Sequence, residues 1–216
     1  MFDVCDQNGW IDAIGAFADK SGGKLDLLVN NAGVAALGSF RDTPLETSLR
    51  IIEVNVIGTI ISINACLRLL EATPNARIIN ISSIAALSGW PQSSVYSASK
   101  AAIYNLTESL ATEWSTCDIA VSDILPGFVD TKLLGEDDEV AAVRKALSVI
   151  GVSWSQPERV ARAVLRTTKS SRIHHTVGSQ ARLYSIIVRL APSLARLISR
   201  KIGKRVAREL AKVRSR

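Results

Sequence analysis

Short apolar runs alternate with longer stretches of helical periodicity, and this alternation restricts the fold of the chain more than any other feature. An apolar run of roughly four to eight residues, bounded by turn residues, predicts a strand that is buried on both faces. Such strands, separated by long helices, are typical of a parallel, doubly wound α/β sheet. The predicted strands are Leu25–Val29, Ala76–Ile81, Ile119–Leu125 and Arg172–Val177.

Apolar residues recur at helical spacing between these strands. Pro44 suits the first turn of a helix, and Gly58 predicts either a bend or two abutting helices. Residues 1–8 are predicted to be the end of a strand that runs into a turn, and residues 130–153, with the acidic run Glu136–Glu139, are less regular. The four helical segments are residues 10–21, 44–72, 94–115 and 156–168.

Polar and turn-forming residues follow three of the predicted strands. The carboxyl ends of parallel strands meet at one edge of the sheet, and ligands of such sheets bind outside that edge. We therefore expect a ligand site where these segments converge. The segments are Asn30–Gly33, Ser82-Ser83 and Pro126-Gly127.

Tyr96 and Lys100 are four residues apart, so they lie on one face if residues 94–115 form a helix. A free tyrosine titrates near pH ~10, and a nearby cation favours the phenolate and lowers that pKa. A tyrosine with a lowered pKa can serve as a general acid or base near neutral pH. The alternative, which this pair alone leaves open, is an ordinary solvated helix face.

The motifs occur in one order along the chain, and together they resemble the short-chain dehydrogenase/reductase family from Asp3 to about Gly178. Ser83 lies thirteen positions before Tyr96, which is the usual serine-to-tyrosine spacing of that family. The resemblance implies a Rossmann-like sheet. The other matching motifs are Asp3-Val4, Asn30-Asn31-Ala32-Gly33, Asn55 in a helix, Tyr96 with Lys100, and the loop from Pro126-Gly127 to Thr131.

The resemblance implies a catalytic role for four residues. Tyr96 would exchange a proton with the substrate oxygen, and Ser83 would hydrogen-bond that oxygen and stabilise its developing charge. Lys100 would lower the pKa of Tyr96 and hold the nicotinamide ribose, while Asn55 would anchor a water that passes protons to Lys100. Taken singly, Ser83 is equally a cap and Asn55 a structural polar contact.

The same resemblance implies a nicotinamide cofactor, NAD or NADP, which carries the hydride. Asn30 and Gly33 are, by themselves, ordinary turn formers. The residues implied to contact the cofactor are Asp3, Val4, Asn30, Ala32, Gly33, Tyr96, Lys100, Pro126, Gly127, Val129 and Thr131.

The family's phosphate-binding motif, Thr-Gly-x-x-x-Gly-x-Gly, does not occur in the sequence and would lie before Asp3. Such glycines let the backbone approach a pyrophosphate at a helix amino terminus. We expect the sheet to be incomplete at its N-terminal side by two strand–helix units, on the order of 50 residues. Leu25–Val29 would then be an unpaired apolar edge, and the chain would bind dinucleotide poorly.

These expectations leave two functions open. The first is an oxidoreductase that interconverts an alcohol and a ketone or aldehyde, on an apolar substrate. The second is a truncated, non-catalytic homologue that binds a partner or a membrane surface. The family often pairs subunits through the two long helices, here residues 44–72 and 94–115, which implies a homo-oligomer.

The net charge of +6 is unevenly distributed. Residues 179–216 hold eleven Lys or Arg and one acid, Glu209, for a charge of +10, whereas the other 178 residues carry −4. Helical spacing of apolar residues, with a break at Pro192, predicts a basic amphipathic tail behind a domain of residues 1–178. Such a tail could lie on an anionic membrane surface, or cover the substrate pocket and pack on the body or a second subunit. Nucleic acid is not expected, because the tail nearly lacks aromatic residues.

The remaining features indicate a cytoplasmic protein, with peripheral membrane contact if the tail binds lipid. Three scattered cysteines show no disulfide or metal spacing, and we expect neither a signal peptide nor a membrane span. His174 and His175 are adjacent on a predicted strand, so they point to opposite faces and are not expected to bind a metal together. Trp90 and Trp154 flank the expected pocket, where they either line it or serve in packing.

Overall fold

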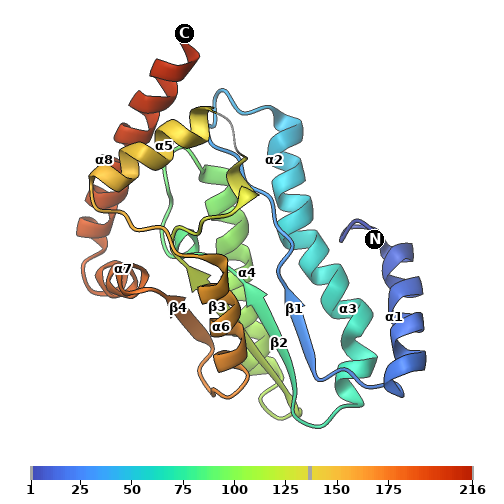
Figure 1. The fold of residues 1–216 in the computed structure, drawn as a ribbon. Coiled ribbons are helices and arrows are strands. Elements are labelled where there is room, and N and C mark those ends of the chain that lie inside the picture. Colours follow the sequence, from blue (N-terminus) through green and yellow to red (C-terminus); the bar gives the residue numbers. More distant parts are fainter. Residues whose placement is uncertain (1, 136–137, 216) are drawn as a thin grey trace.

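Four parallel strands form one sheet at the centre of the computed structural model, which describes residues 2–135 and 138–215 (Figure 1). The strands lie in chain order, and each pairs in parallel with the next. The predicted α/β architecture is therefore confirmed, and each predicted strand is found within two residues of its expected bounds. The strands are β1 (Leu27–Asn30), β2 (Ala76–Ile81), β3 (Ile119–Pro126) and β4 (His174–Val177).

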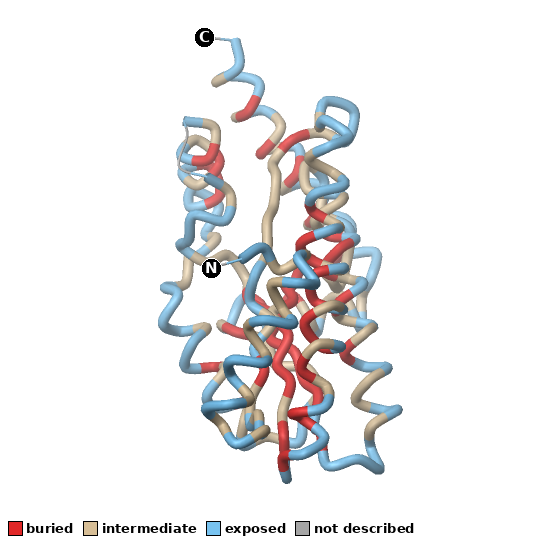
Figure 2. The backbone as a smooth tube through the Cα atoms, turned by 90° about the vertical axis from the view of Figure 1, so that its right-hand side faces the viewer, coloured by how far each residue is buried: buried red, intermediate tan, exposed pale blue. Residues whose placement is uncertain are grey.

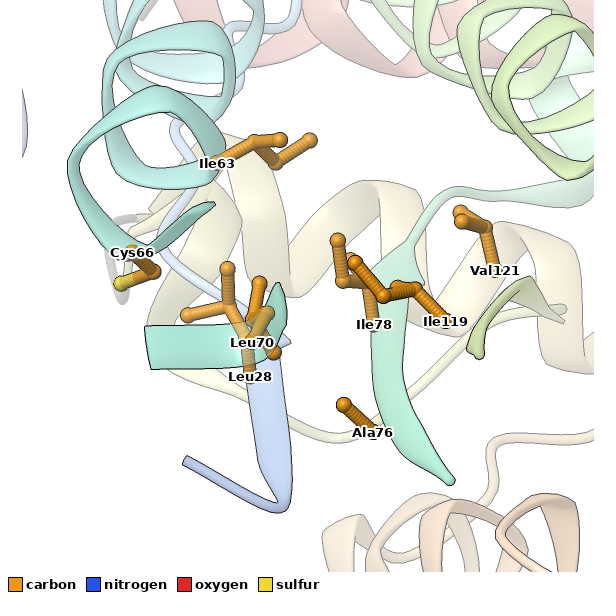
Figure 3. Packing of buried hydrophobic residues seen from close by; sticks show 8 residues of the cluster. All are labelled: Leu28, Ile63, Cys66, Leu70, Ala76, Ile78, Ile119 and Val121. Atoms are coloured by element: carbon orange, nitrogen blue, oxygen red, sulfur yellow. The ribbon is translucent and has the colours of Figure 1, made fainter. Parts of the chain in front are cut away.

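Helices cover both faces of the sheet, as expected for a doubly wound fold. Helices α3 (Gly58–Glu71) and α4 (Ser94–Glu113) pack on one face, and α6 (Pro157–Thr167) packs on the other. Because side chains alternate along a strand, Ile78 and Ile79 enter opposite layers of the core. Figure 3 shows the layer beneath α3, and Figure 2 shows that the buried backbone is concentrated in the strands and the adjoining helices.

The segment predicted as helix 44–72 consists of abutting helical pieces, which is one of the two predicted forms, and the last piece begins at Gly58. Helix α2 (Leu45–Ile52) passes into a π-helical turn, η1 (Glu53–Ile57), and then into α3. Gly58 has ordinary helical angles, and a side chain there would begin 2.7 Å from Cγ2 of Val4. Gly58 is thus explained by the close approach of the N-terminal segment and not by a bend.

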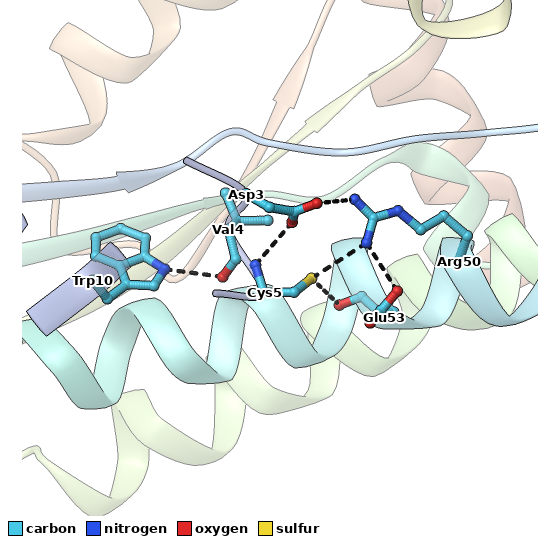
Figure 4. A network of polar contacts seen from close by, with 6 residues as sticks. All are labelled: Asp3, Val4, Cys5, Trp10, Arg50 and Glu53. Atoms are coloured by element: carbon cyan, nitrogen blue, oxygen red, sulfur yellow. Dashed lines mark hydrogen bonds and ion pairs between the residues drawn. The ribbon is translucent and has the colours of Figure 1, made fainter. Parts of the chain in front are cut away.

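The N-terminal segment forms the predicted turn, at Val4 and Cys5, but residues 2–8 contain no strand. Helix α1 (Gln7–Ser21) follows, and the Asp6 side chain caps it by accepting from the Asn8 amide at 3.0 Å. The carbonyl of Val4 accepts a 2.9 Å hydrogen bond from Nε1 of Trp10 (Figure 4). Side-chain contacts with α1 and α2, and not strand pairing, therefore fix this segment.

Residues 130–153 are more regular than predicted, because they include helix α5 (Asp138–Val149) and a short 3-10 turn, Lys132–Leu134. Glu136 and Asp137 of the predicted acidic run lie outside the described residues. Val143 and Leu147 of α5 pack against the C-terminal helix. Their spacing was a usable helical signal that the acidic residues nearby obscured.

The C-terminal segment is helical and breaks at Pro192, as predicted. Helices α7 (Ser179–Leu190) and α8 (Pro192–Arg214) pack on each other, and α8 also packs along α5. A side chain at Gly203 of α8 would begin 2.4 Å from Cβ of Pro91, so α8 lies directly against the loop before α4. The buried face of α8 consists of Ala195, Ser199, Gly203, Val206 and Leu210.

Strand β1 is an edge strand in the described sheet, which agrees with the expected apolar edge. Val29 remains 37% exposed there. The helical run Leu45–Glu71 is long and apolar enough to cross a membrane by length and composition, although no span was predicted. Its α3 part packs on β1 and β2, as a core helix does.

Replacing Gly203 by Ala tests the packing of α8 on the body. The new methyl group would overlap the ring of Pro91, so we expect the free energy of unfolding to fall by about 1–3 kcal/mol in urea denaturation. Gly15→Ala in α1 is the matched control, because a methyl group there meets no atom within 4 Å. It should raise stability by roughly 0.5–1 kcal/mol. Equal effects of the two substitutions would contradict the packing described.

Candidate active site

A cavity of about 910 Å³ lies at the carboxyl ends of β1, β2 and β3. The three turn segments that follow these strands all contribute to its wall, so the predicted convergence is confirmed. From these segments come Asn31, Ala32 and Gly33 after β1, Ser82 and Ser83 after β2, and Pro126 and Gly127 at the end of β3.

Tyr96 and Lys100 line this cavity from the first turns of α4. Nζ of Lys100 lies 5.8 Å from the centre of the Tyr96 ring and donates a 2.8 Å hydrogen bond to the carbonyl of Ile81. Ser83, which follows β2, lines the same cavity as Tyr96 and influences the pKa of its phenol. The hydroxyl of Ser82 donates to the carbonyl of Lys100 at 3.0 Å, which fixes the helix against the end of β2. A phenol, a hydroxyl and an ammonium therefore meet in one cavity.

The ionisation of this trio differs from the sequence prediction. Burial raises the pKa of the Tyr96 phenol, and its hydrogen bond to Ser83 only partly opposes that rise. Lys100 was expected to lower this pKa. Instead, the ammonium is itself buried, and burial lowers the pKa of Lys100 to about 8. At neutral pH the phenol therefore keeps its proton, and Lys100 is mostly charged.

Asn55 does not line the cavity but ties its parts together from within the π-helical turn. Its Oδ1 accepts from the Val34 amide at 2.8 Å, and its Nδ2 donates to the Val34 carbonyl and to Oγ of Ser99, each at 2.9 Å. The side chain is buried. Asn55 thus joins the turn after β1 to the helix that carries Tyr96 and Lys100.

Gly33 is held between Asn55 and Lys100, where a side chain would not fit well. A Cβ at this position would lie 3.2 Å from Oδ1 of Asn55 and 3.5 Å from Nζ of Lys100. The glycine therefore leaves open space in front of the ammonium. This space is on the cavity side and is where a polar group of a ligand could reach Lys100.

Three residues expected to contact a cofactor do not line the cavity. Asp3 pairs with Arg50, Val4 packs on Gly58, and neither belongs to the cavity wall (Figure 4). Asn30 is the last residue of β1, and its side chain points toward α3 because strand side chains alternate. There its Oδ1 accepts from Ser62 at 2.6 Å and its Nδ2 donates to Asn80 at 2.8 Å.

Asn30 belongs to a row of polar residues that crosses the sheet. Asn30, Asn80, Asp123 and His174 are register partners on the four strands. Nδ1 of His174 lies 2.9 Å from Oδ1 of Asp123, and burial raises the pKa of that carboxyl while the histidine opposes the rise. Among the described residues, no group of three or more His, Cys, Asp or Glu could hold a metal.

Four more of the residues expected to contact a cofactor line the cavity, at the end of β3 and on the loop after it. Pro126, Gly127, Val129 and Thr131 all contribute to its wall. The hydroxyl of Thr131 also caps the short turn that follows, by accepting from the Leu133 amide at 3.4 Å.

Aromatic rings form another part of the cavity wall. Phe128 makes an edge contact with Trp90, with ring centres 5.8 Å apart, and it lies 5.1 Å from Trp154. Both tryptophans were considered for this position, and both line the cavity. Phe128 and Leu37 were not singled out, although Phe128 falls inside the recognised loop. The guanidinium of Arg144 lies 4.3 Å over the Trp154 ring.

Known sequences resemble this chain over most of its length. A family profile described as short chain dehydrogenase matches residues 1–141. The protein named inactive 2-(S)-hydroxypropyl-CoM dehydrogenase 2, from Xanthobacter autotrophicus, is 38% identical over 170 residues, which cover 76% of this chain and 73% of that protein. The short-chain type dehydrogenase/reductase y4vI of Sinorhizobium fredii is 32% identical over 173 residues, which cover 77% of this chain but 31% of that protein.

Solved structures share the fold. The 3-oxoacyl-[acyl-carrier protein] reductase of Brucella melitensis, in complex with NAD, is 25% identical with a TM-score of 0.73 and covers 83% of this chain and 76% of that one. A short chain dehydrogenase of Burkholderia cenocepacia, in complex with NADP, is 27% identical with a TM-score of 0.70 and covers 83% and 74% of the two chains.

Replacing Asn55 by Ala should loosen the site, because both backbone groups of Val34 lose their partner and the link from Val34 to Ser99 is broken. We expect the free energy of unfolding to fall by roughly 2–4 kcal/mol. Asn105→Ala is the matched control, since the exposed Asn105 makes a single 3.0 Å bond to Ala101 within α4. Its effect should stay within about 0.5 kcal/mol. A neutral Asn55→Ala would show that this residue does not hold the site together.

Proposed function

The chain belongs to the short-chain dehydrogenase/reductase family, and from this premise we propose that it interconverts an alcohol and a ketone or aldehyde in the cavity described. The supporting observation is that Ser83, Tyr96 and Lys100 reach this one cavity from two different elements. A phenol beside a hydroxyl and a cation is the arrangement that proton transfer to a carbonyl oxygen requires.

Each residue has a defined task in this proposal. During carbonyl reduction, Tyr96 gives a proton to the carbonyl oxygen as negative charge develops on it. During alcohol oxidation, Tyr96 takes the proton from the alcohol oxygen. Ser83 donates a hydrogen bond to the same oxygen. Lys100, charged at neutral pH, stabilises the phenolate that remains after the proton has left. Because burial raises the pKa of Tyr96, the phenol is protonated and ready for carbonyl reduction.

The residues present fit one end of a nicotinamide cofactor. Lys100 faces the space in front of Gly33, and the loop from Pro126 to Thr131 borders the same space. These groups would hold the nicotinamide and its ribose, and the bound nicotinamide would supply or accept the hydride. Residues 1–216 contain no glycine-rich motif to hold the pyrophosphate. Both NAD and NADP are found in similar proteins, so the proposal names either.

An apolar substrate suits the remaining wall of the cavity. Trp90, Phe128 and Trp154 form an aromatic surface, and Leu37 adds to it. This surface has few polar groups with which to select a charged substrate. The proposal is therefore a small alcohol or carbonyl compound with an apolar body.

The proposal also includes the assembly and location of the protein, which would be a homo-oligomer in the cytoplasm. The segment from α2 to α3, one of the two through which the family often pairs, carries exposed apolar residues that a second subunit would cover. These residues are Leu45, Leu49, Ile57 and Ile60.

A second candidate function is binding without catalysis. One observation favours it, since a relative at 38% identity is itself named an inactive dehydrogenase. In this alternative the polar trio persists, but the chain does not hold a dinucleotide tightly enough to use it.

Replacing Tyr96 by Phe distinguishes the two functions. The chain is titrated with NADH and NADPH by fluorescence, and turnover is measured with a panel of apolar secondary alcohols and ketones. For the oxidoreductase, Tyr96→Phe should lower kcat by about 10²-fold or more and leave dinucleotide affinity unchanged.

Tyr104→Phe is the control, because Tyr104 lies on the same helix but stacks on His174 outside the cavity wall. It should keep full turnover. Turnover that survives in Tyr96→Phe would contradict the proposed role of the phenol. The absence of NADH and NADPH binding to the unaltered chain would instead support the non-catalytic function.

A further inference from the structure

Helices α7 and α8 carry a stripe of exposed apolar side chains that the proposed reaction does not use. Leu190, at the end of α7, is 77% exposed, and Leu183 is 59% exposed. The stripe recurs every three or four residues and continues across the break at Pro192 into α8. Its members are Leu183, Ile186, Leu190, Leu194 and Leu197.

The opposite faces of the same two helices anchor them to the body. Tyr184 of α7 and Ala195 of α8 are buried in one cluster with Leu125 of β3. The hydroxyl of Tyr184 is hydrogen-bonded to Ser88 at 2.5 Å, and Gly203 packs on Pro91. Since these inward faces are occupied, the apolar stripe faces away from the sheet. In Figure 1 the two helices form the side of the molecule farthest from α1.

Cations accompany the stripe, and acids do not. Between residues 179 and 208 the sequence has no Asp or Glu. Along α8 the outward face changes from Leu194 and Leu197 to Lys201, Lys204 and Arg208 at the same helical spacing. The remaining exposed cations beside the stripe are Arg182, Arg189, Arg196 and Arg200.

The ion pairs of α8 lie at its far end, outside the stripe. Lys212 pairs with Glu209, and Arg214 pairs with Glu139 of α5. The cations nearer the break between α7 and α8 therefore make the surface around the apolar stripe strongly positive. Its charge contrasts with the net −4 of residues 1–178.

We propose that the outward surface of α7 and α8 docks on an anionic phospholipid membrane. The five apolar side chains would enter the boundary between headgroups and acyl chains, and the flanking arginines and lysines would contact lipid phosphates and carboxylates. Nucleic acid would satisfy the cations but leave the leucines exposed. The helices themselves need not move, because their inward faces remain packed on the body.

This surface would place the catalytic cavity next to the membrane. Helix α8 packs against α5 and, through Gly203, against the loop that carries Trp90 and Pro91. Trp90 lines the cavity. Helix α8 would then lie between the membrane and the loop that carries Trp90 and Pro91. This consequence depends on the proposed function, whereas the docking surface itself does not.

Sedimentation of the full 216-residue chain with lipid vesicles tests the docking surface. Vesicles of phosphatidylcholine with phosphatidylserine are compared with vesicles of phosphatidylcholine alone. The chain should pellet with the anionic vesicles and bind the neutral ones at least tenfold more weakly, and salt should reduce the binding.

Two double variants separate the apolar and the charged contributions. Leu190→Ser with Leu194→Ser should lower the affinity for anionic vesicles at least tenfold, and Arg196→Gln with Arg200→Gln should lower it severalfold. Ile11→Ser is the control, because Ile11 is 68% exposed on α1, away from this surface, and its replacement should change nothing. Circular dichroism verifies that each variant is folded.

Three outcomes would overturn the proposal. The first is a failure of the unaltered chain to pellet with anionic vesicles, and the second is a leucine variant that pellets as well as the unaltered chain. In the third, sedimentation equilibrium shows that the unaltered chain is a dimer and the leucine variant a monomer, and neither binds vesicles. This result would assign the stripe to contact with a second copy of the chain. None of these results depends on dinucleotide binding or turnover, so the docking surface and the proposed function can fail separately.

Discussion

The buried ammonium of Lys100 is the interaction on which the rest of the site depends. Removing an ammonium from water is costly unless a partner replaces the lost hydration. Here the carbonyl of Ile81, at the end of β2, accepts from Nζ at 2.8 Å. The position of α4 relative to the sheet is therefore fixed by the strand end itself. Burial also lowers the pKa of Lys100 to about 8, so the charge survives at neutral pH but is held weakly.

The parts around Lys100 follow from this arrangement. A side chain at Gly33 would be crowded, because its Cβ would lie 3.2 Å from Oδ1 of Asn55, with Nζ of Lys100 in contact beside it. Asn55 then holds the adjacent backbone of Val34 to α4 through Ser99. The π-helical turn that carries Asn55 is an uncommon conformation that often marks functional sites. The aromatic wall of the cavity depends on a different part of the chain. Buried residues of α5 and α8 pack against Phe128 and Trp154 and hold them in place.

Much of this could be predicted from the sequence, because the relevant signals are local. Apolar runs located the strands, and the residues just after them located the cavity. The spacing of Tyr96 and Lys100 placed both on one helical face. The direction of the Tyr96 pKa could not be predicted, because it depends on how completely the fold buries the phenol. Asn30 was assigned to the cofactor side, but its position as the last strand residue directs it to the α3 face.

The least predictable elements are those set by contacts between distant segments. Asp3 and Val4 were expected to follow a strand, but they are fixed by Arg50 and by the space that Gly58 leaves. Helix α5 needs α8 as its partner, and nothing local to residues 138–149 reveals that partner. The π-helical turn has no sequence pattern comparable to that of an α-helix. The partners of Asp3 and of α5 are far away in the sequence, and local periodicity does not identify such partners.

An NMR titration of the ε-methylene carbon of Lys100 against pH tests whether this residue is a buried ammonium beside Tyr96. The resonance is assigned by its loss in Lys100→Met. A buried Lys100 ammonium should titrate with a midpoint near pH 8, well below the ordinary lysine value of 10.5. A midpoint at the ordinary value would show that the ammonium is solvated, and would contradict the arrangement from which the proposed chemistry follows.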